Sequence, residues 1–539
     1  MISGVRQRFE RASTERAIQK QVERVESYLA SSSPPAGDDT PVLVFNASTR
    51  IRTLSLNGAF SLLAAWAIRA TGNPVRHLVC QAGMQQCMLG TDRSNPSQPP
   101  PCEQCMSFSR LIYREDLSVG LGLDLELGEK LLPELSSSSL EALNTWTYRG
   151  LDLGRLCLPT VRWALRRHNL LDDEPTRELY RQYLLSAASL TEAIERQLEA
   201  LSPRAIVLFN GITYPEAVAR ALALKREIPV VTHEVGLKPL SAFFSHDHAT
   251  FRSVEVPDES ELNGHWKSDL ESYLSDRREG QFSMAGVQFW PEMETLPDWL
   301  ENKIAGFESM VSIFTNVAFD TSQVHANTIF EHMFEWLDAL SRVIQETPET
   351  LFVIRAHPDE DRPGKESAET VAAWFESSGL RGRDNVVFIA PVEKASSYDL
   401  IERAQLVLVY NSSIGLEAAI QGQPVLCAGR ARYAEAEAAF FPGNREEYLR
   451  MLNDFLAAAT VEVPERFAEN GKLFLYRELY QASLDLSDFL QPYPSMQGMV
   501  SLRDFAPELL GEHPALHAIR SGVLEGKPFL MPSQAIPVS

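Results

Sequence analysis

The sequence predicts an α/β protein with two domains, each built on a parallel sheet covered by helices. Short apolar runs alternate with amphipathic segments of helical length in both halves of the chain. Such continuous apolar runs are typical of parallel strands that are buried on both faces. At 539 residues the chain is also too long for one ordinary core. We therefore expect one sheet domain over residues 41–300 and a second over 301–490, facing each other across a cleft.

The composition is that of an ordinary globular enzyme, with 44% hydrophobic and 23% charged residues. Acidic residues outnumber basic ones by 72 to 50, and the net charge of -22 repels a nucleic-acid backbone, which argues against a nucleic-acid partner. The N-terminal segment lacks the apolar core of a signal peptide, and no later segment has the apolar length of a membrane span. We expect a cytoplasmic protein without a transmembrane segment; peripheral association with a membrane stays open.

The first domain is predicted to follow a charged helical leader and a Ser/Pro/Gly linker, which together occupy residues 1–40. PVLVFNAST predicts a buried strand from Pro41, AFSLLAAWAIRATG a helix that ends at Gly72, and VRHLVC a second strand. Residues 106–200 have mainly helical patterns and are expected to decorate this domain. The sheet pattern then resumes with the strands PRAIVLFNG and PVVTHEVG, which the helix PEAVARALALKREI separates.

Polar residues follow the last two of these strands. Asn210 and Gly211 end the first, and Glu234 lies at the end of the second. Ligands of an open α/β sheet bind at the carboxyl ends of its strands, so these residues are candidates for a binding site. At this position Glu234 can act as a general base, whereas a lone Glu is more commonly a helix-capping or ion-paired surface carboxylate.

Four of the six cysteines fall within 26 residues: Cys80, Cys87, Cys102 and Cys105. Four thiolates can bind a zinc ion or an iron–sulfur cluster, and the closing C-x2-C is the commonest half of such a site. The alternative is a loop with four thiols and no metal. A redox pair at Cys102 and Cys105 is less favoured because no strand leads into it. The clustering therefore predicts a structural metal.

The second domain begins with MVSIFTNVAFD, which predicts a strand followed by Asn316. After a helix, LFVIRAHPDEDRPG predicts a strand that ends at Arg355 and leads to His357. His357 can give a phosphate a hydrogen bond or a positive charge, and Asn316 and Arg355 are further candidates for an anion site. The alternative for His357 is a structural role before a Pro-bent loop. The tail over residues 491–539 is not placed by its pattern.

The stretch LVLVYNSSIGLEAAIQGQPVLCA, residues 406–428, predicts a strand, a turn, a short helix and a strand. Asn411, Ser412 and Ser413 are of the residue types that cap helices, and Gly415 allows the backbone to approach a ligand closely. Unpaired amides and the positive end of a helix dipole make a phosphate a natural guest of this turn. An ordinary capped crossover is the alternative.

The motifs FNG, HEVG, SIFTNVAFD, VIRAHPDEDRPG and YNSSIGLEAAIQGQPVLCAG resemble the capsule polysaccharide biosynthesis family of glycosyltransferases. That family has the GT-B fold of two facing Rossmann-like domains. The resemblance extends over residues 300–430, is patchier over 203–250, and is weak in the cysteine loop, the helical insert and the tail. The His-Pro pair and the two adjacent serines are also similar to motifs of bacterial transferases that use CMP-activated sialic acid or Kdo.

This resemblance implies that Glu234 deprotonates the acceptor hydroxyl while His357, Ser412 and Ser413 hold the departing donor phosphate. Glu417, on the short helix, is a candidate to contact the ribose or sugar of the donor, and an ordinary solvated helix Glu is the alternative. Asn210 and Gly211 are expected on the acceptor side. A helix N-terminus can stabilise the phosphate without a metal. We therefore expect catalysis that needs no cofactor and follows an inverting course. The CMP-sugar enzymes often have an acid or Asn where this chain has Val235, and this departure leaves both the base and the choice between a CMP- and a UDP-sugar donor open.

Together these features predict a GT-B glycosyltransferase of surface polysaccharide biosynthesis. Its partners would be a nucleotide-sugar donor and a glycan, lipid-linked or protein-linked acceptor. Two alternatives stay open. One is a nucleotide-sugar epimerase of the same fold, which converts a UDP-sugar without an acceptor. The other is a non-catalytic scaffold protein with this fold, stabilised by a metal at the four cysteines.

Overall fold

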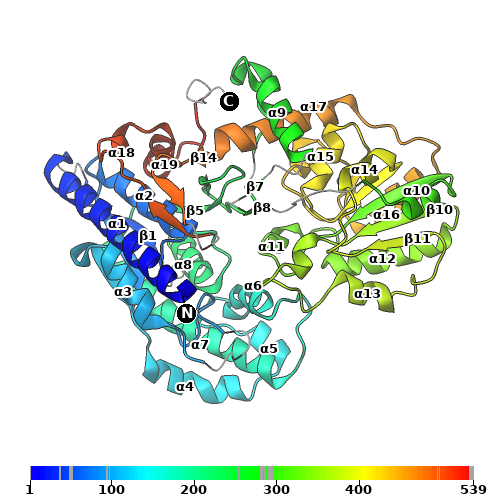
Figure 1. Ribbon diagram of the computed structural model, residues 1–539. Helices are drawn as coiled ribbons and strands as arrows, with labels where there is room; N and C mark the ends of the chain where they lie inside the picture. The colour runs from blue at the N-terminus through cyan, green and yellow to red at the C-terminus, as the bar shows by residue number, and fades with distance from the viewer. Residues whose placement is uncertain are drawn as a thin grey trace.

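The computed structural model confirms the predicted α/β class and shows two sheets, each flanked by helices (Figure 1). Both sheets are built mainly from parallel strands, as in the GT-B architecture. Within the described part of the chain, no helix combines the length and apolar character needed to cross a membrane. The structure describes residues 2–34, 38–47, 53–92, 95, 98–252, 254–278, 283–284, 287–288, 295–493, 496 and 498–532.

The first sheet has seven strands in the order β14-β6-β5-β4-β1-β2-β3. Five of them are parallel: β1 (Val42–Phe45), β2 (Val75–Cys80), β3 (Ser118–Leu121), β4 (Ala205–Phe209) and β5 (Val230–Val235). Two antiparallel strands extend one edge: β6 (Ser241–Ser245) and β14 (Leu484–Asp485). The four apolar runs predicted as strands in this domain are confirmed. The sequence did not predict β3, because this strand has only four residues and most of them are not buried.

Helices cover both faces of the first sheet because its strands alternate their side chains. Val42 and Val44 of β1 pack on one side with α1 (Ile2–Ser32), α2 (Leu56–Arg69) and α19 (Pro514–Glu525). Leu43 and Phe45 point the other way, into a core with α6 (Leu153–Leu165), α7 (Glu174–Leu201) and α8 (Tyr214–Lys225). The remaining helices here are α3 (Cys102–Ile112), α4 (Leu125–Ser136), α5 (Leu140–Asn144) and α18 (Leu509–Glu512).

The second sheet is entirely parallel and has the order β11-β10-β9-β12-β13. Its strands are β9 (Ser309–Phe314), β10 (Thr350–Arg355), β11 (Val386–Ile389), β12 (Leu406–Val409) and β13 (Val425–Cys427). The predicted strands of this domain correspond to β9, β10, β12 and β13. The helices around it are α9 (Trp266–Arg278), α10 (Asp298–Ile304), α11 (Gln323–Ala326), α12 (Met333–Glu346), α13 (Val371–Ser377), α14 (Ser397–Arg403), α15 (Ile414–Ile420), α16 (Arg445–Ala457) and α17 (Glu465–Tyr476).

Short elements complete the fold. Two small ribbons pair β7 (Ser283–Met284) with β8 (Val287–Gln288) and β15 (Leu490–Pro492) with β16 (Val500–Leu502). A π-helix, Arg477–Ala482, continues α17. The 3-10 turns are Glu115–Leu117, Glu259–Glu261, Pro358–Asp361 and Ala434–Ala436.

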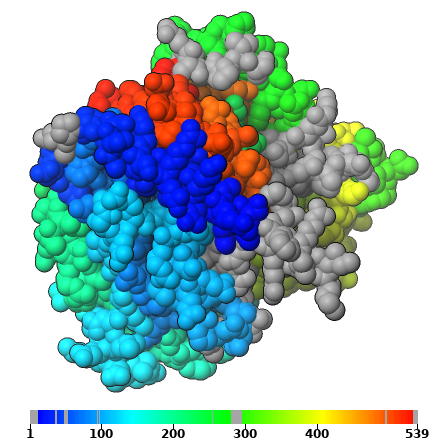
Figure 2. Space-filling view, turned by 60° about the vertical axis from the view of Figure 1, so that its left-hand side comes forward, coloured from blue at the N-terminus to red at the C-terminus, as the bar shows by residue number. Residues whose placement is uncertain are grey.

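The chain crosses between the two domains and then returns. Trp266 of α9 and Leu300 of α10 belong to a core of the second domain, although they precede residue 301. The C-terminal tail packs into the first domain, where Leu502 and Ile519 join the core formed with α1 and α2. The orange and red tail accordingly lies beside the blue N-terminal helix (Figures 1 and 2). By packing, the first domain therefore consists of two separate stretches of the sequence.

A buried ion pair lies where the returning chain meets the first domain. Arg252, which follows β6, donates from Nε to Oε1 of Glu478 at 3.1 Å, and both residues are almost fully buried. The Arg252 guanidinium also stacks on the ring of Phe243, 3.5 Å from its centroid. Each charge in this contact depends on the other, because neither can reach bulk water.

Replacing Glu478 with Gln should lower the free energy of unfolding by about 3–5 kcal/mol, because it leaves the buried Arg252 guanidinium without a counter-charge. Urea unfolding followed by circular dichroism measures this change. Glu376→Gln is the matched control, since Glu376 pairs with Arg381 on the surface and its loss should cost less than about 1 kcal/mol. Equal effects of the two substitutions would contradict a structural role for the buried pair.

Candidate active site

Three neighbouring strands of the second sheet end in predicted site residues. β9 lies between β10 and β12, and Asn316, His357 and Asn411 follow these three strands in turn. The Asn316 amide Nδ2 donates to Oδ1 of Asn411 at 2.7 Å, and Gln323 Nε2 donates to the same oxygen at 3.2 Å. The structure therefore brings three separate segments together at one edge of the sheet.

The His357 ring is held as a neutral hydrogen-bond donor. Its Nδ1 accepts the backbone N–H of Asp359 at 3.1 Å, and its own backbone N–H donates to Oγ1 of Thr315 at 3.2 Å. Since Nδ1 is an acceptor, the proton of the neutral ring lies on Nε2. Burial lowers the pKa of His357. At neutral pH this side chain can therefore give a ligand a hydrogen bond rather than a full positive charge.

The Ser412–Ser413 turn leaves a hydroxyl that its own helix does not use. Ser413 is the N-cap residue of α15, but its side chain makes no capping hydrogen bond and is exposed. Ser412 is buried, and its carbonyl accepts the Tyr433 hydroxyl at 2.9 Å. The sequence indicated that a serine of this turn caps the helix through its side chain. The structure shows no such hydrogen bond at Ser413. Its hydroxyl is available to a ligand at this edge.

Gly415 is required by packing inside the domain. A Cβ atom at this position would overlap the hydroxyl group of Tyr433. The space that a larger residue would fill is therefore taken by this tyrosine. A close approach of ligand to the Gly415 backbone stays a prediction.

Arg355 is directed into the protein. The side chain is buried at the end of β10, and its guanidinium donates to the backbone carbonyls of Ala390 and Glu393, the latter at 2.7 Å. Burial lowers its pKa to about 10. These contacts tie the loop after β11 to β10, and a contact with phosphate stays a prediction.

Glu417 is likewise engaged inside the second domain. Its carboxylate is buried, pairs with Nη2 of Arg277 at 2.7 Å and accepts the Tyr398 hydroxyl. This network links α15 to α9 and α14. The predicted contact with the donor ribose or sugar would have to compete with these partners, and it remains untested.

In the first sheet, Glu234 and Asn210 lie side by side at the ends of β5 and β4. Nδ2 of Asn210 donates to Oε2 of Glu234 at 3.2 Å, and the Val235 backbone N–H donates to Oε1 at 2.9 Å. Gly211 has φ +76°, a left-handed conformation that favours glycine and turns the chain sharply after β4. His233, the residue before Glu234 in β5, points to the opposite face of the sheet, where its Nε2 contacts the Ser61 hydroxyl at 2.8 Å.

The surroundings of Glu234 combine groups from both domains. Burial raises the pKa of its carboxyl group, and the hydrogen bonds from Val235 and Asn210 oppose this effect. Asp320 of the second domain raises this pKa further, whereas Arg432 of the same domain lowers it. Asp320 also raises the pKa of His357, against the larger effect of burial. The Asp320 carboxylate therefore acts on the pKa of both Glu234 and His357.

Contacts beside this region hold the domains together. Arg432 Nε donates to the Thr250 carbonyl at 3.1 Å, and the Arg430 guanidinium lies over the ring of Phe251, 4.3 Å from its centroid. Thr250 and Phe251 follow β6, whereas both arginines follow β13. The segment after β6 of the first domain and the segment after β13 of the second are thus joined directly.

Two pairs of histidine rings also bridge the domains. His248 packs on His325 with ring centroids 4.1 Å apart, and His168 packs on His332 at 4.6 Å. Burial lowers the pKa of His168 to about 3 and that of His325 to about 4. The rings are therefore neutral at pH 7. As the pH falls below about 6.5, the unfolded chain takes up protons that the folded one does not, so these contacts contribute less stability.

The sequence did not assign a role to four residues near the site: Asp320, Gln323, Arg432 and Tyr433. Arg432 follows the end of β13, and the same strand-end signal that selected His357 could have selected it. Asp320 lies in the loop after β9, close to Asn316 in the chain. Tyr433 and Gln323 carry no comparable signal, because neither directly follows a predicted strand.

The helical insert holds a pocket of about 410 Å³ beside the domain contact at His168. It is lined by Leu140, Glu141, Asn144, Leu158, Arg162, His168, Asn169, Leu170 and Asp172. Arg162 Nε donates to the His168 carbonyl at 2.9 Å. The pocket is open and mixes apolar with polar groups, which suits a ligand rich in hydroxyl groups.

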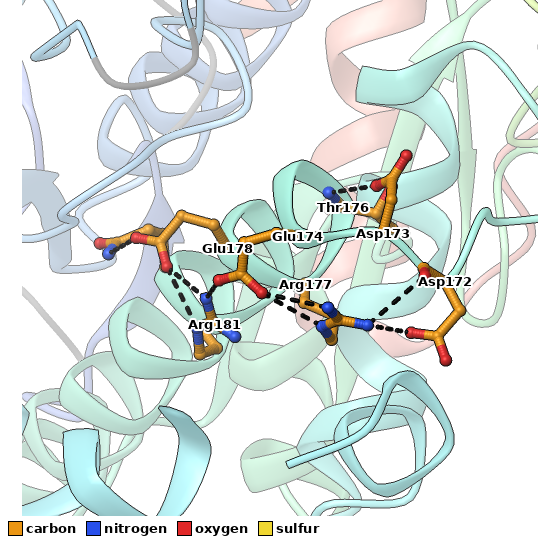
Figure 3. Close-up of polar contacts among 8 residues, drawn as sticks. Asp172, Asp173, Glu174, Thr176, Arg177, Glu178 and Arg181 are labelled. Carbon is orange, nitrogen blue, oxygen red and sulfur yellow. Dashed lines mark hydrogen bonds and ion pairs between the residues drawn. The ribbon is translucent and has the colours of Figure 1, made fainter. Parts of the chain in front are cut away.

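Charged residues at the start of α7, next to this pocket, are paired with one another (Figure 3). Arg181 is buried and contacts Glu174 and Glu178, with Nη2 donating to Oε2 of Glu178 at 2.8 Å. Arg177 Nη1 donates to Oδ1 of Asp172 at 2.6 Å. These pairs fix the start of the helix and are not a second binding site.

The four clustered cysteines all line one cavity, which lies beside the end of β2 in the first sheet. None of the six cysteines forms a disulfide. Within the part of the chain that the structure describes, no three His, Cys, Asp or Glu side chains lie close enough together to hold a metal ion. The positions of these side chains therefore do not by themselves show the predicted structural metal.

Comparison with known families gives one match. Residues 301–436 match the family "Capsule polysaccharide biosynthesis protein". The resemblance predicted from the sequence is confirmed over this segment, which contains Asn316, His357 and the Ser412–Ser413 turn. No curated protein matches the chain. The family match covers the second sheet and does not include Glu234.

Solved structures with some likeness include bacterial sugar enzymes. A Thermosulfurimonas dismutans KpsC, described as a beta Kdo 2,4 transferase, has 14% identity and a TM-score of 0.33 over 52% of this chain and 80% of that one. A putative UDP-N-acetylglucosamine 2-epimerase from Listeria monocytogenes has 10% identity and a TM-score of 0.24 over 91% and 98%. The Neisseria meningitidis UDP-GlcNAc 2-epimerase has 12% identity and a TM-score of 0.22 over 81% and 98%. TM-scores this low do not support an inference about function.

Replacing Asp320 with Asn should lower the pKa of both Glu234 and His357. Loss of the negative charge makes deprotonated Glu234 less costly and protonated His357 less favourable. Titration of the carboxyl ¹³C and imidazole ¹H resonances by NMR measures both values. Asp454→Asn, on the exposed face of α16, is the matched control. If neither group responds to Asp320→Asn, the two strand edges do not face each other in solution.

Proposed function

We propose that this protein is a glycosyltransferase that moves a sugar from a nucleotide-sugar donor to a hydroxyl group of a glycan or glycoconjugate in surface polysaccharide synthesis. The observation that carries the proposal is that Glu234 lies at the end of β5 in the first sheet and His357 follows β10 in the second, in domains that the contact of Arg432 with Thr250 joins. The family match over residues 301–436 supports the same conclusion for the donor half.

Glu234 is proposed as the general base. Its carboxylate takes the proton of the acceptor hydroxyl while that oxygen forms a bond to the anomeric carbon of the sugar. A pKa raised by burial makes this carboxylate more basic than an exposed one. The hydrogen bonds from Asn210 and Val235 hold it in place and leave other lone pairs on its oxygens for the acceptor. Attack from the side opposite the leaving group gives inversion at that carbon.

The phosphate of the donor is proposed to leave at the edge of the second sheet. The bond between the anomeric carbon and the phosphate oxygen breaks as the new bond forms, and its electrons stay on the phosphate. Nε2–H of His357 and the Ser413 hydroxyl can donate hydrogen bonds to that charge. The Gly415 and Leu416 amides at the start of α15 already donate to carbonyls of the turn, so they are not counted among the donors. This arrangement assigns the stabilising role to protein donors without a metal.

The acceptor is proposed to enter from the first domain. Asn210 and Gly211 lie next to the base, and the pocket of about 410 Å³ in the helical insert offers Arg162, Asn169 and other polar groups for further sugar units. The donor would be a CMP- or UDP-sugar, consistent with the His-Pro and Ser-Ser motifs. A cytoplasmic location would give the protein access to both the donor and the acceptor.

A thermal-shift panel of CMP, UDP, GDP and their sugars tests the proposal. At 100 times its Kd the correct nucleotide should stabilise the folded protein by about 2.7 kcal/mol, seen as a rise in Tm. The rise should shrink in His357→Ala, which removes a donor to the phosphate. His265→Ala, an exposed histidine of the same domain, should respond like the wild-type protein.

The outcomes distinguish the alternatives. A nucleotide that stabilises the wild-type protein, together with conversion of a UDP-sugar in the absence of acceptor, would identify an epimerase. If no nucleotide or nucleotide-sugar raises the Tm of well-folded protein, the chain is a non-catalytic scaffold and the proposed function is wrong.

A further inference from the structure

Four cysteines from three separate places in the chain line one cavity of about 20 Å³. Cys80 is the last residue of β2, Cys87 lies in the following loop, and Cys102 and Cys105 begin α3. A C-x2-C pair at the start of a helix places both sulfur atoms on the same side, one turn apart. The volume is enough for one water-sized occupant. Four of the six thiols in the chain therefore surround a common space.

Two of these cysteines lie in matching turns. The Gly83 backbone N–H donates to Sγ of Cys80 at 3.4 Å, and the Gly90 backbone N–H donates to Sγ of Cys87 at 3.1 Å. Both turns have the sequence Cys-x-x-Gly. A backbone N–H aimed at sulfur stabilises a thiolate more than a thiol, because the anion is the better acceptor. Thiolate is also the form of cysteine that binds metals.

Gly90, in the second of these turns, lies where the two halves of the cysteine loop come close together, and a side chain would not fit there. A Cβ atom on Gly90 would lie 2.7 Å from Cβ of Pro100 and 2.9 Å from Sγ of Cys87. Pro100 and Pro101 lead directly into Cys102. The missing side chain therefore allows the Cys87 turn to lie against the segment that carries the C-x2-C pair.

We propose that Cys80, Cys87, Cys102 and Cys105 bind a metal centre through four thiolates, either a zinc ion or an iron–sulfur cluster. In this structure the four sulfur atoms line the cavity without meeting at ion-binding distance. A zinc ion matches this water-sized space and would draw the sulfur atoms toward it, whereas an iron–sulfur cluster would require the loop to move outward. Both centres need four sulfur ligands of this kind, so the ligand set is common to the two.

The centre would be structural. β2 is separated from β5 by β1 and β4, which puts Cys80 roughly 15 Å from Glu234 at about 4.8 Å per strand. The cysteine loop contacts the element that carries the acceptor side, because the Tyr214 hydroxyl at the start of α8 donates to the Gln86 carbonyl. Gln85 N–H also donates to the Ser186 hydroxyl of α7 at 2.9 Å. Bound metal would thus stabilise the loop that packs behind the Asn210 turn.

Metal analysis of the full chain purified without oxygen tests this proposal. We expect about one zinc per chain, or iron together with acid-labile sulfide, and X-ray absorption at the metal edge should show only sulfur in the first shell. Cys102→Ser and Cys105→Ser should each lose at least tenfold of the bound metal and lower the Tm. Cys157→Ser and Cys427→Ser are the matched controls, since both cysteines are buried but lie away from the cavity, and they should keep the metal.

Three results would overturn the proposal. One is wild-type protein that is stable, contains no metal and binds neither added Zn²⁺ nor a reconstituted iron–sulfur cluster. The second is a first shell with nitrogen or oxygen in place of sulfur. The third is a disulfide between Cys102 and Cys105 in protein from reducing cells. The spectroscopic readout uses the wild-type chain, so the test stands even if a serine variant fails to fold. It is also independent of nucleotide binding, so its failure leaves the proposed function untouched.

Discussion

The direction of the parallel strands determines where the chemistry of this protein can lie. In a parallel sheet every carboxyl end reaches the same edge, and each loop that leaves a strand begins there. His357, Asn316 and Asn411 follow three adjacent strands of the second sheet, and Asn210 and Glu234 end two adjacent strands of the first. Contacts between the segments after β6 and β13 then join the two domains. Without them each edge would hold only half of the proposed site.

Polar residues near these edges fall into two groups. Arg355 and Glu417 are buried and have partners within the second domain, so they stabilise the loops on which the site depends. The Ser413 hydroxyl is not used to cap its helix, and His357 presents a donor at Nε2. A buried polar group without a partner is costly, and a group held ready for a ligand is kept near solvent. This difference separates residues that hold the site from those that can bind a substrate.

Much of this organisation could be predicted from the sequence. The apolar runs of the parallel strands are strong local signals, and polar residues at their ends pointed to both edges. Partners distant in the chain left no such signal: Arg277 is 140 positions from Glu417, and Tyr433 fills the space beside Gly415. The return of the tail to the first domain was also unpredictable, because its helices pack by shape on α1 and α2. The four cysteines could be grouped by spacing, but the matching N–H to sulfur turns required the structure.

The role of Glu234 is tested most directly by the rate at which Glu234→Gln releases nucleotide from the donor that the wild-type protein uses. Gln has the same shape but cannot take a proton, and its single carbonyl oxygen can keep only one of the hydrogen bonds from Asn210 and Val235, which go to different carboxylate oxygens of Glu234. We expect kcat to fall by about 10²–10⁴-fold while the affinity for the nucleotide changes little. Transfer by Glu234→Gln at the wild-type rate would contradict the assignment of Glu234 as the base.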